Sequence, residues 1–466
     1  MSGDWLWWLQ LGFIGYFLLL NGTYLMLNLL SMASLLASMR ERSEIGEAAP
    51  YLGVEPPVSV LMPAFNEAAT IRTSVRSMLQ LQYPEFEVLV INDGSTDRTL
   101  ALLIEEFELV PHPEPLRQAV AHQSVTTIYR SRRYANLRVV DKLNGGKADA
   151  LNAGINAARH GLFCSVDADS ILQRDSLLRV VQPFLEDERT IAAGGTVRIA
   201  NGSQVRGGFL IKAGLPRNWL ARFQIVEYLR AFLFGRLGWS PLNAVLIISG
   251  AFGLFDRERV MAVGGYRTDT VGEDMELVVR LHRYHREQRI PYRIRYLPDP
   301  ICWTECPEDL ATLGRQRSRW QRGLAESLSR HAWLAFGLRG GAAGWLAWPF
   351  MALFEWVGPL IELLGYAFML GGFAVGAVSP AALALFLLMA IGMGILLSVS
   401  GLLLETLSFH VYSRRRDMLL LFLMAVMENF GYRQLNTLWR CRGLWQWFSR
   451  RKHHWGAMRR DGSWGQ

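Results

Sequence analysis

Long apolar runs near both ends restrict the fold of this chain more than any other feature. Trp5–Ala37 contains no charged residue, and about Trp345–Phe373 and Ala381–Phe409 are two further runs of spanning length. In a bilayer only helices and closed barrels satisfy their own backbone hydrogen bonds, and about 20 apolar residues make one crossing. No basic segment precedes the first run, which favours a retained helix over a cleaved signal peptide. We therefore expect a membrane protein with three or four spans.

Basic residues at the ends of these runs predict how the chain is oriented. Lys and Arg favour the cytoplasmic side of a membrane. Arg40 and Arg42 would therefore place the N-terminus outside and the large middle region inside, and Arg414–Arg416 would return the chain to the inside. Met418–Met427 is only about half a span long, so a short re-entrant or interfacial helix fits it as well as a fourth span does.

The C-terminal tail accounts for much of the net charge of +8 without a nucleic-acid partner. Arg440–Arg460 holds seven Lys and Arg residues, interspersed with Trp445, Trp447, Phe448 and Trp455. Basic residues mixed with aromatics suit the surface of an anionic membrane, and no nucleic-acid-binding motif accompanies them. We expect contact with membrane lipids and no binding of nucleic acid.

Three carboxylates, Glu355, Glu362 and Glu405, lie inside the C-terminal apolar runs. A charged group in a bilayer is costly and usually faces a polar cavity or a partner of opposite charge. Two interpretations stay open for these three residues. They line a passage for a hydrophilic chain, or they pair with arginines or backbone groups near an interface.

Between the apolar runs, from Pro57 to about Arg330, short strands alternate with helices. Four apolar, largely β-branched runs are bounded by turn residues: Val58–Met62, Val88–Asn92, Leu137–Val140 and Leu162–Val166. This alternation predicts a mostly parallel sheet with helices on both faces, and ligands of such sheets bind beyond the carboxyl ends of the strands. Pro111–Tyr134 shows no periodicity, and we expect a surface insertion there.

Acidic residues occur where these strands end. Asn66 and Glu67 follow the first strand, Asp93 the second, and Asp167 and Asp169 a later one. In extended chain, residues two apart project to the same side, so Asp167 and Asp169 can address one site, and their oxygens suit Mg²⁺ or Mn²⁺ bridging a diphosphate. Asp93 could accept hydrogen bonds from a base or ribose, whereas Ser95 or Asp97 in the same turn would cap the next helix.

Three further motifs complete the set. Gly145-Gly146-Lys147 opens a helix, where backbone amides and a cation favour a phosphate, although the spacing is not that of a P-loop. Gly272-Glu273-Asp274 opens another helix, and Asp274 is either a helix cap or a general base for an attacking hydroxyl. Gln316, Arg319 and Trp320 share one amphipathic helix, which suits either lipid headgroups or a phosphate and a sugar ring.

Together these motifs resemble the membrane-integrated, processive family 2 glycosyltransferases, the group of the cellulose, hyaluronan, chitin and poly-N-acetylglucosamine synthases. The resemblance covers roughly Pro57–Arg330 and is closest to the poly-N-acetylglucosamine synthases, through chain size and Ser249–Phe252 followed by Gly264–Tyr266. It implies an A-type glycosyltransferase fold, a mostly parallel Rossmann-like sheet flanked by transmembrane and interfacial helices. It also implies a UDP-sugar donor, Mg²⁺ or Mn²⁺ and a β-linked product. The usual Thr-Glu-Asp is Gly-Glu-Asp here.

The resemblance also implies roles for individual residues. Asp274 would be the base, and Asp169 and Asp167 would hold the metal. The predicted donor contacts are Ala64, Glu67, Asp93, Lys147, Asp167, Gln316, Arg319 and Trp320. The predicted acceptor contacts are Ser249, Gly250, Phe252, Glu273 and Trp320.

These observations predict an inverting, metal-dependent transferase that extends a β-linked polysaccharide at the bacterial inner membrane, from UDP-N-acetylglucosamine or UDP-glucose. A synthase that adds one or a few sugars to a lipid acceptor is the alternative, and a catalytically inactive subunit of an export complex is a third interpretation. Accessory export subunits are compatible with either enzyme. We expect an N-terminal helix (1–42), a cytosolic catalytic domain (57–305), interfacial helices (306–340), membrane helices (345–440) and a basic tail (441–466).

Overall fold

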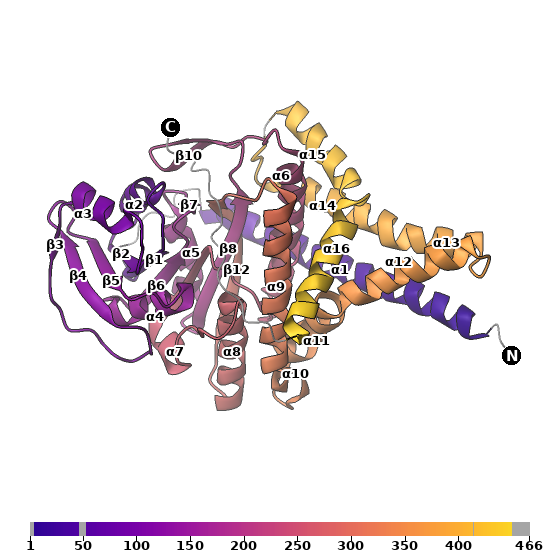
Figure 1. The fold of residues 1–466 in the computed structure, drawn as a ribbon, viewed down its shortest axis with the longest axis horizontal. Helices are drawn as coiled ribbons and strands as arrows, with labels where there is room; N and C mark the ends of the chain where they lie inside the picture. The colour runs from indigo at the N-terminus through magenta and orange to yellow at the C-terminus, as the bar shows by residue number, and fades with distance from the viewer. Residues whose placement is uncertain (1–3, 46–52, 413, 450–466) are drawn as a thin grey trace.

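The computed structural model describes residues 4–45, 53–412 and 414–449. Figure 1 shows an α/β domain on one side and helices on the other, with α1, α12 and α13 projecting away from the sheet. The central sheet has ten strands in the order β3-β4-β5-β2-β1-β6-β11-β8-β12-β7. The strands, of which β9 and β10 form a separate hairpin, are β1 Val58–Ala64, β2 Phe86–Asp93, β3 Leu109–Pro111, β4 Val125–Ser131, β5 Leu137–Lys142, β6 Leu162–Val166, β7 Ile171–Leu172, β8 Thr190–Ile199, β9 Gln204–Arg206, β10 Phe209–Lys212, β11 Phe252–Asp256 and β12 Arg293–Thr304.

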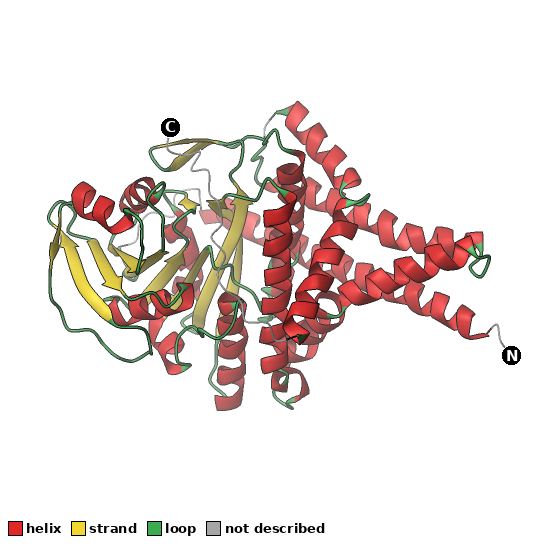
Figure 2. Ribbon diagram, in the orientation of Figure 1, coloured by secondary structure: helices red, strands yellow, loops and turns green. Residues whose placement is uncertain are grey.

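Helices cover both faces of the sheet and make up the other half of the protein, beyond the sheet (Figure 2). The α-helices are α1 Asp4–Ile45, α2 Ile71–Leu79, α3 Thr99–Phe107, α4 Lys147–Ala157, α5 Ser176–Glu186, α6 Trp219–Tyr228, α7 Arg257–Ala262, α8 Glu273–Gln288, α9 Leu310–Arg330, α10 Trp333–Phe336, α11 Trp348–Phe350, α12 Gly358–Ala374, α13 Pro380–Leu387, α14 Met393–Ser408, α15 Arg415–Met427 and α16 Tyr432–Phe448. Short π- or 3₁₀-helical turns lie at η1 Leu229–Phe234, η2 Leu237–Trp239, η3 Ala343–Ala347, η4 Met351–Trp356 and η5 Leu388–Gly392.

The strand register explains why distant motifs meet. β1 pairs in parallel with β2 and β6, and β2 pairs in parallel with β5, so the carboxyl ends of these strands share one edge of the sheet. β11 runs antiparallel to β6 and begins opposite its end, with Phe252 paired to Val166. The segment just before β11 is therefore delivered to the same edge. The four predicted strands are all present, because buried central strands leave continuous apolar runs in the sequence.

The expected surface insertion is partly wrong. Residues 125–131 form β4, which pairs antiparallel with β5, and β3 adds a further antiparallel strand outside β4. Within β4 only two side chains are buried, that of Ile128 in the middle of the strand and that of Ser131 at its end. An edge strand of this kind, exposed on one face, carries too weak an apolar pattern to be recognised from sequence alone.

Two helical stretches are long and apolar enough to cross a membrane, Trp5–Ala37 and Pro380–Ser408. A pair of helices bent by 45°, Ala343–Trp356 and Gly358–Ala374, makes a third if it is counted as one span. These are the three predicted runs, and they are consistent with a membrane location. α15 has 13 residues, fewer than one crossing needs. α16 continues through residue 440, where we expected the membrane helices to end and the basic tail to begin. Residues 450–466 of the basic tail lie outside the described residues.

Candidate functional site

A cavity of about 1,320 Å³ opens at the carboxyl edge of the sheet and continues among the membrane-side helices. All but one of the residues predicted for the site line it: Ala64, Glu67, Asp93, Lys147, Asp167, Asp169, Ser249, Gly250, Glu273, Asp274, Gln316, Arg319 and Trp320. The exception, Phe252, corrects our prediction of an acceptor contact. It is the first residue of β11, a strand buried on both faces, and it lies fully buried in the hydrophobic core.

The backbone of one residue, Gly250, joins the predicted base to the predicted donor cation. The N–H of Gly250 donates to Oδ2 of Asp274 at 3.0 Å, and Nζ of Lys147 donates to the Gly250 carbonyl at 3.1 Å. A Cβ at Gly250 would lie 3.0 Å from Nζ of Lys147 and 3.4 Å from Oδ2 of Asp274, so any side chain here would push on both groups. Asp274 also accepts from the N–H of Met275 at 2.8 Å.

Lys147 is the central cation of the site. Its ammonium contacts Oδ1 of Asp167 and lies 3.9 Å from Oε1 of Glu273. Burial opposes the charge, but Asp167, Glu273 and Asp274 outweigh it, so the pKa of Lys147 lies above its usual value. For Glu273, burial outweighs the neighbouring cation. Burial and the nearby Asp274 raise the pKa of the Glu273 carboxyl to about 7, although Lys147 acts to lower it.

The carboxylate of Asp93 already accepts several hydrogen bonds within the protein, which its position at a strand end did not predict. Its Oδ1 accepts from Lys142 Nζ at 2.6 Å and from the N–H of Gly145 at 3.0 Å. Its Oδ2 accepts from the N–H of Gly146 at 2.7 Å and from Nδ2 of Asn144 at 3.1 Å. Asp93 therefore holds the turn that starts α4. It would have to exchange one of these donors before accepting a bond from a nucleotide, and the two glycine amides are likewise occupied.

The neighbouring loops anchor the other donor-side residues. Ala64 ends β1, and Glu67 follows in the turn before α2, where Oγ1 of Thr70 donates to its carboxylate at 2.9 Å. Neither Ser95 nor Asp97 occupies the cap position of α3, which is Arg98, but Oδ1 of Asp97 accepts from the N–H of Thr99, the first residue of the helix, at 2.9 Å. Despite partial burial, these hydrogen bonds keep the pKa of Asp97 below its usual value.

The two predicted metal ligands lie in a tight turn, which corrects the expectation of extended chain. β6 ends at Val166, and the N–H of Ser170 donates to the Asp167 carbonyl at 3.0 Å. Asp167 and Asp169 nevertheless line the same cavity. No group of three or more His, Cys, Asp or Glu in the described ranges is arranged to hold a metal by itself. Two carboxylates fit a hard cation whose remaining ligands come from a diphosphate and water.

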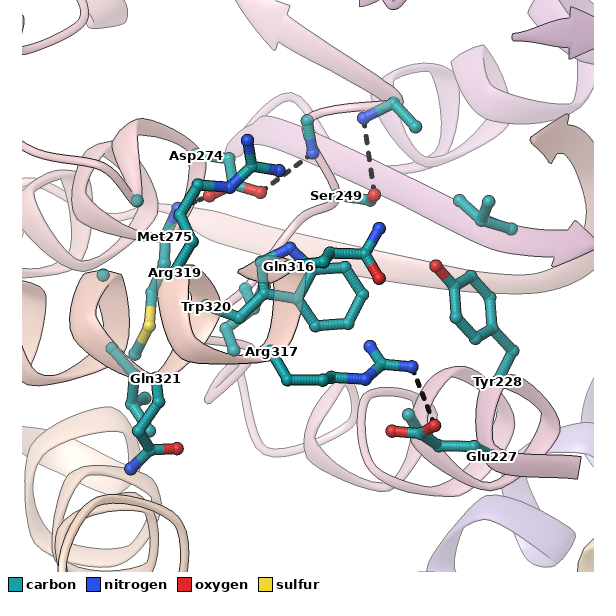
Figure 3. Close-up of a pocket in the computed structure, with 18 of the residues that line it drawn as sticks. Glu227, Tyr228, Ser249, Asp274, Met275, Gln316, Arg317, Arg319, Trp320 and Gln321 are labelled. Atoms are coloured by element: carbon teal, nitrogen blue, oxygen red, sulfur yellow. Dashed lines mark hydrogen bonds and ion pairs between the residues drawn. The ribbon is translucent and has the colours of Figure 1, made fainter. Parts of the chain in front are cut away.

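The helix that carries Gln316, Arg319 and Trp320 touches the start of α8 without any intervening side chain. A Cβ on Gly323 of α9 would lie 2.8 Å from Cα of Gly272, and a Cβ on Gly272 would lie 2.9 Å from Cα of Gly323. This contact accounts for glycine at the position before Glu273-Asp274, where a threonine side chain would have no space. It brings the base and the three α9 side chains around one space, as Figure 3 shows.

Two residues of this site escaped the sequence analysis. Arg317 lies within the α9 motif, but only the structure shows that it is buried and that its Nη2 donates to Oε2 of Glu227 at 2.8 Å. Glu227 belongs to α6, a helix with no recognisable motif. A salt bridge between helices that are 90 residues apart leaves no local pattern, so no signal in the sequence would have found it.

The three membrane carboxylates divide between the two interpretations. Glu355 and Glu362 line the cavity and are also paired: Nη2 of Arg440 donates to Oε2 of Glu355 at 2.7 Å, and Oγ1 of Thr437 donates to Oε2 of Glu362 at 2.9 Å. Glu405 is buried against Arg198 of β8 and is not part of the cavity lining. Glu405 therefore fits only the interpretation in which the carboxylate pairs with an arginine.

Comparison with known proteins gives the family. The profile described as "Glycosyl transferase family 2" matches residues 59–211, and that of "Glycosyl transferase family group 2" matches residues 162–399. The poly-beta-1,6-N-acetyl-D-glucosamine synthase of Staphylococcus epidermidis is 30% identical over 277 residues, and that of Staphylococcus aureus (strain COL) is 32% identical over 276 residues. Each alignment covers 59% of this chain and 56% of the relative. The chain thus spans about half the length of the curated relatives that it matches.

Among solved structures, the mannosyltransferase PcManGT from Pyrobaculum calidifontis, in complex with GDP-Man and Mn²⁺, is 19% identical. Its TM-score is 0.49, and the match covers 89% of this chain and 99% of that chain. The two family profiles together extend over most of the described sheet and well into the C-terminal helices, and the second alone matches half of the chain. The motifs that suggested the resemblance all lie within the matched residues. The chain belongs to glycosyltransferase family 2.

Proposed function

We propose that this protein is an inverting UDP-sugar transferase that extends a β-linked polysaccharide at the bacterial inner membrane, with UDP-N-acetylglucosamine as the favoured donor. The observation that carries the proposal is one continuous cavity. At the sheet edge the cavity is lined by the cation Lys147, the acids Asp167 and Asp169 and the predicted base Asp274. It then continues between polar side chains of the helices beyond the sheet. The printed names of the staphylococcal relatives support the choice of sugar.

In this proposal Asp274 accepts the proton of the acceptor hydroxyl as its oxygen attacks the anomeric carbon. The N–H groups of Gly250 and Met275 hold the carboxylate in place. No second carboxylate is placed as a nucleophile in the predicted set, so direct displacement with inversion follows. Lys147 would move from Asp167 toward the diphosphate and neutralise its developing charge.

Asp167 and Asp169 would hold Mg²⁺ or Mn²⁺ together with the diphosphate, and the metal would supply Lewis-acid stabilisation of the leaving nucleoside diphosphate. Trp320 would offer its indole face to the acceptor sugar. Arg319 and Gln316, on the same helix, would contact the diphosphate.

The proposal is tested by incorporation of labelled sugar from a panel of UDP-sugars with Mn²⁺, using the full-length protein in lipid nanodiscs and sizing the products. Long polymer from one donor is the expected result, and it names the sugar as well. Short, lipid-extractable product would replace the proposal with the glycolipid synthase. No turnover with any donor would contradict both enzymes and favour the inactive export subunit.

A further inference from the structure

A buried ion pair supports the acceptor side of the cavity. Arg317 on α9 is 3% exposed, and its Nη2 donates to Oε2 of Glu227 on α6 at 2.8 Å. Burial disfavours the charged guanidinium, but Glu227 outweighs that cost, so the pKa of Arg317 lies above its usual value. Breaking the pair would leave the Arg317 charge buried without compensation.

Arg317 also packs against the indole ring of Trp320. Its Cζ lies 4.3 Å from the ring centroid of Trp320, a cation–π contact. Trp320 lines the cavity and is 43% exposed. The ring of Tyr228 also lies near the indole, with 6.4 Å between the two ring centroids, so a ligand can reach only the part of the indole that Arg317 and Tyr228 leave exposed. Figure 3 shows Arg317 between Trp320 and Glu227.

The Glu227 carboxylate is shared by a third helix. Tyr432 of α16 donates its hydroxyl to Oε2 at 2.6 Å, and Nδ2 of Asn436 lies 3.4 Å from Oε1. Burial and the neighbouring Glu227 raise the pKa of Tyr432 well above its usual value, so the phenol stays a donor. One carboxylate thus fixes the mutual positions of α6, α9 and α16 beside the cavity.

We propose that Glu227 is a positioning residue for the acceptor: it fixes Arg317 and thereby the plane and open face of Trp320 on which an acceptor sugar stacks. The inference rests on the proposed function and names which half of the reaction Glu227 serves. The predicted donor residues Lys147 and Asp167 belong to other elements, at the sheet edge. Gln316 and Arg319 share α9 with Arg317, so loss of Glu227 should weaken acceptor binding much more than donor binding, which also depends on the untouched Lys147 and Asp167.

The test uses full-length protein in nanodiscs, UDP-N-acetylglucosamine and an added N-acetylglucosamine oligosaccharide as acceptor. Glu227→Gln should raise the KM for the oligosaccharide about tenfold, the effect of roughly 1.4 kcal/mol. The KM for the donor and the affinity for UDP should stay within about twofold, well inside 0.5 kcal/mol. Glu87→Gln is the matched control, because Glu87 also pairs with a buried arginine, Arg138, at 3.2 Å but does not line the cavity.

A double variant separates positioning from a direct contact. Arg317→Met should raise the acceptor KM similarly, and Glu227→Gln combined with Arg317→Met should be no worse than either single change, since both act through one pair. If Glu227→Gln does not fold, Arg317→Lys tests the same link, because it keeps the charge but loses the planar stack on the indole.

Three outcomes would overturn the inference. They are an unchanged acceptor KM in Glu227→Gln, an equal rise in the donor KM, and strictly additive losses in the double variant. Each of these leaves the proposed function standing, because the wild-type protein still transfers sugar. Absence of transfer by the wild-type protein would overturn the proposed function itself and this inference with it.

Discussion

At the scale of single residues, Asp274 has the clearest predicted chemistry, and Asp274→Asn tests it. Asparagine keeps the size of the side chain, but it cannot take up a proton. Transfer should fall at least about 100-fold, since a positioned base contributes 10²–10⁴-fold. Binding of UDP, measured by calorimetry, should stay close to wild type because Lys147 and Asp167 are untouched. Transfer above about a tenth of the wild-type rate would show that Asp274 is not the base.

The second prediction at this scale concerns the metal. Asp169→Asn should weaken binding of UDP in the presence of Mn²⁺ by about tenfold, the effect of losing roughly 1.4 kcal/mol. Binding in EDTA should be the same for variant and wild type. Titrations of UDP with and without Mn²⁺ measure this directly, and Asp175→Asn, a change outside the cavity lining, is the control. Equal Mn²⁺-dependent gains in the Asp169→Asn and wild-type proteins would remove Asp169 from the ligand set.

The residues that could be predicted from sequence are those that follow strands. A buried parallel strand leaves an unbroken apolar run, so its end and the polar residues that follow can be predicted, and Asp93 and Asp167 both line the cavity. The conformation of a loop and the direction in which its side chains point could not be predicted from the sequence. The turn that holds Asp167 depends on one backbone hydrogen bond to Ser170, and Phe252 is buried because β11 is an interior strand covered on both faces.

At the scale of elements, the contact between α8 and α9 decides where the base stands relative to the α9 side chains. Gly323→Ala should insert a methyl group 2.8 Å from Cα of Gly272. Because both close neighbours are backbone, α8 must shift, at a cost of about 1–3 kcal/mol. We expect transfer to fall much more than UDP affinity, since the base moves but the donor loops do not.

The matched control for that prediction is Gly161→Ala, because a Cβ there meets nothing within 4 Å and its backbone is not left-handed. Initial rates and UDP titrations of both variants make the comparison. Full activity in Gly323→Ala would mean that α8 and α9 separate without moving Asp274. The element pattern itself was predictable, whereas this contact was not: two glycines 51 residues apart carry no sign that they touch.

At the scale of the whole molecule, a buried ion pair couples the sheet to the membrane helices. Arg198 of β8 and Glu405 of α14 are each 2% exposed and contact one another across the two halves. Sequence showed a carboxylate in an apolar run but not its partner, because β8 and α14 lie about 200 residues apart.

The last prediction uses this pair. Glu405→Gln should lower the free energy of unfolding by about 3–5 kcal/mol, since it leaves the Arg198 guanidinium buried without a counter-charge. Arg198→Met combined with Glu405→Met should recover most of that loss, because a neutral, well-packed pair needs no compensation. Denaturant unfolding in detergent, followed separately by UDP binding and by helix content, measures both. If the single change unfolds the catalytic half while α14 stays helical, the pair couples the halves. If the double variant is less stable than the single one, the charges themselves stabilise the junction, and the coupling must be assigned to other contacts between β8 and the helices.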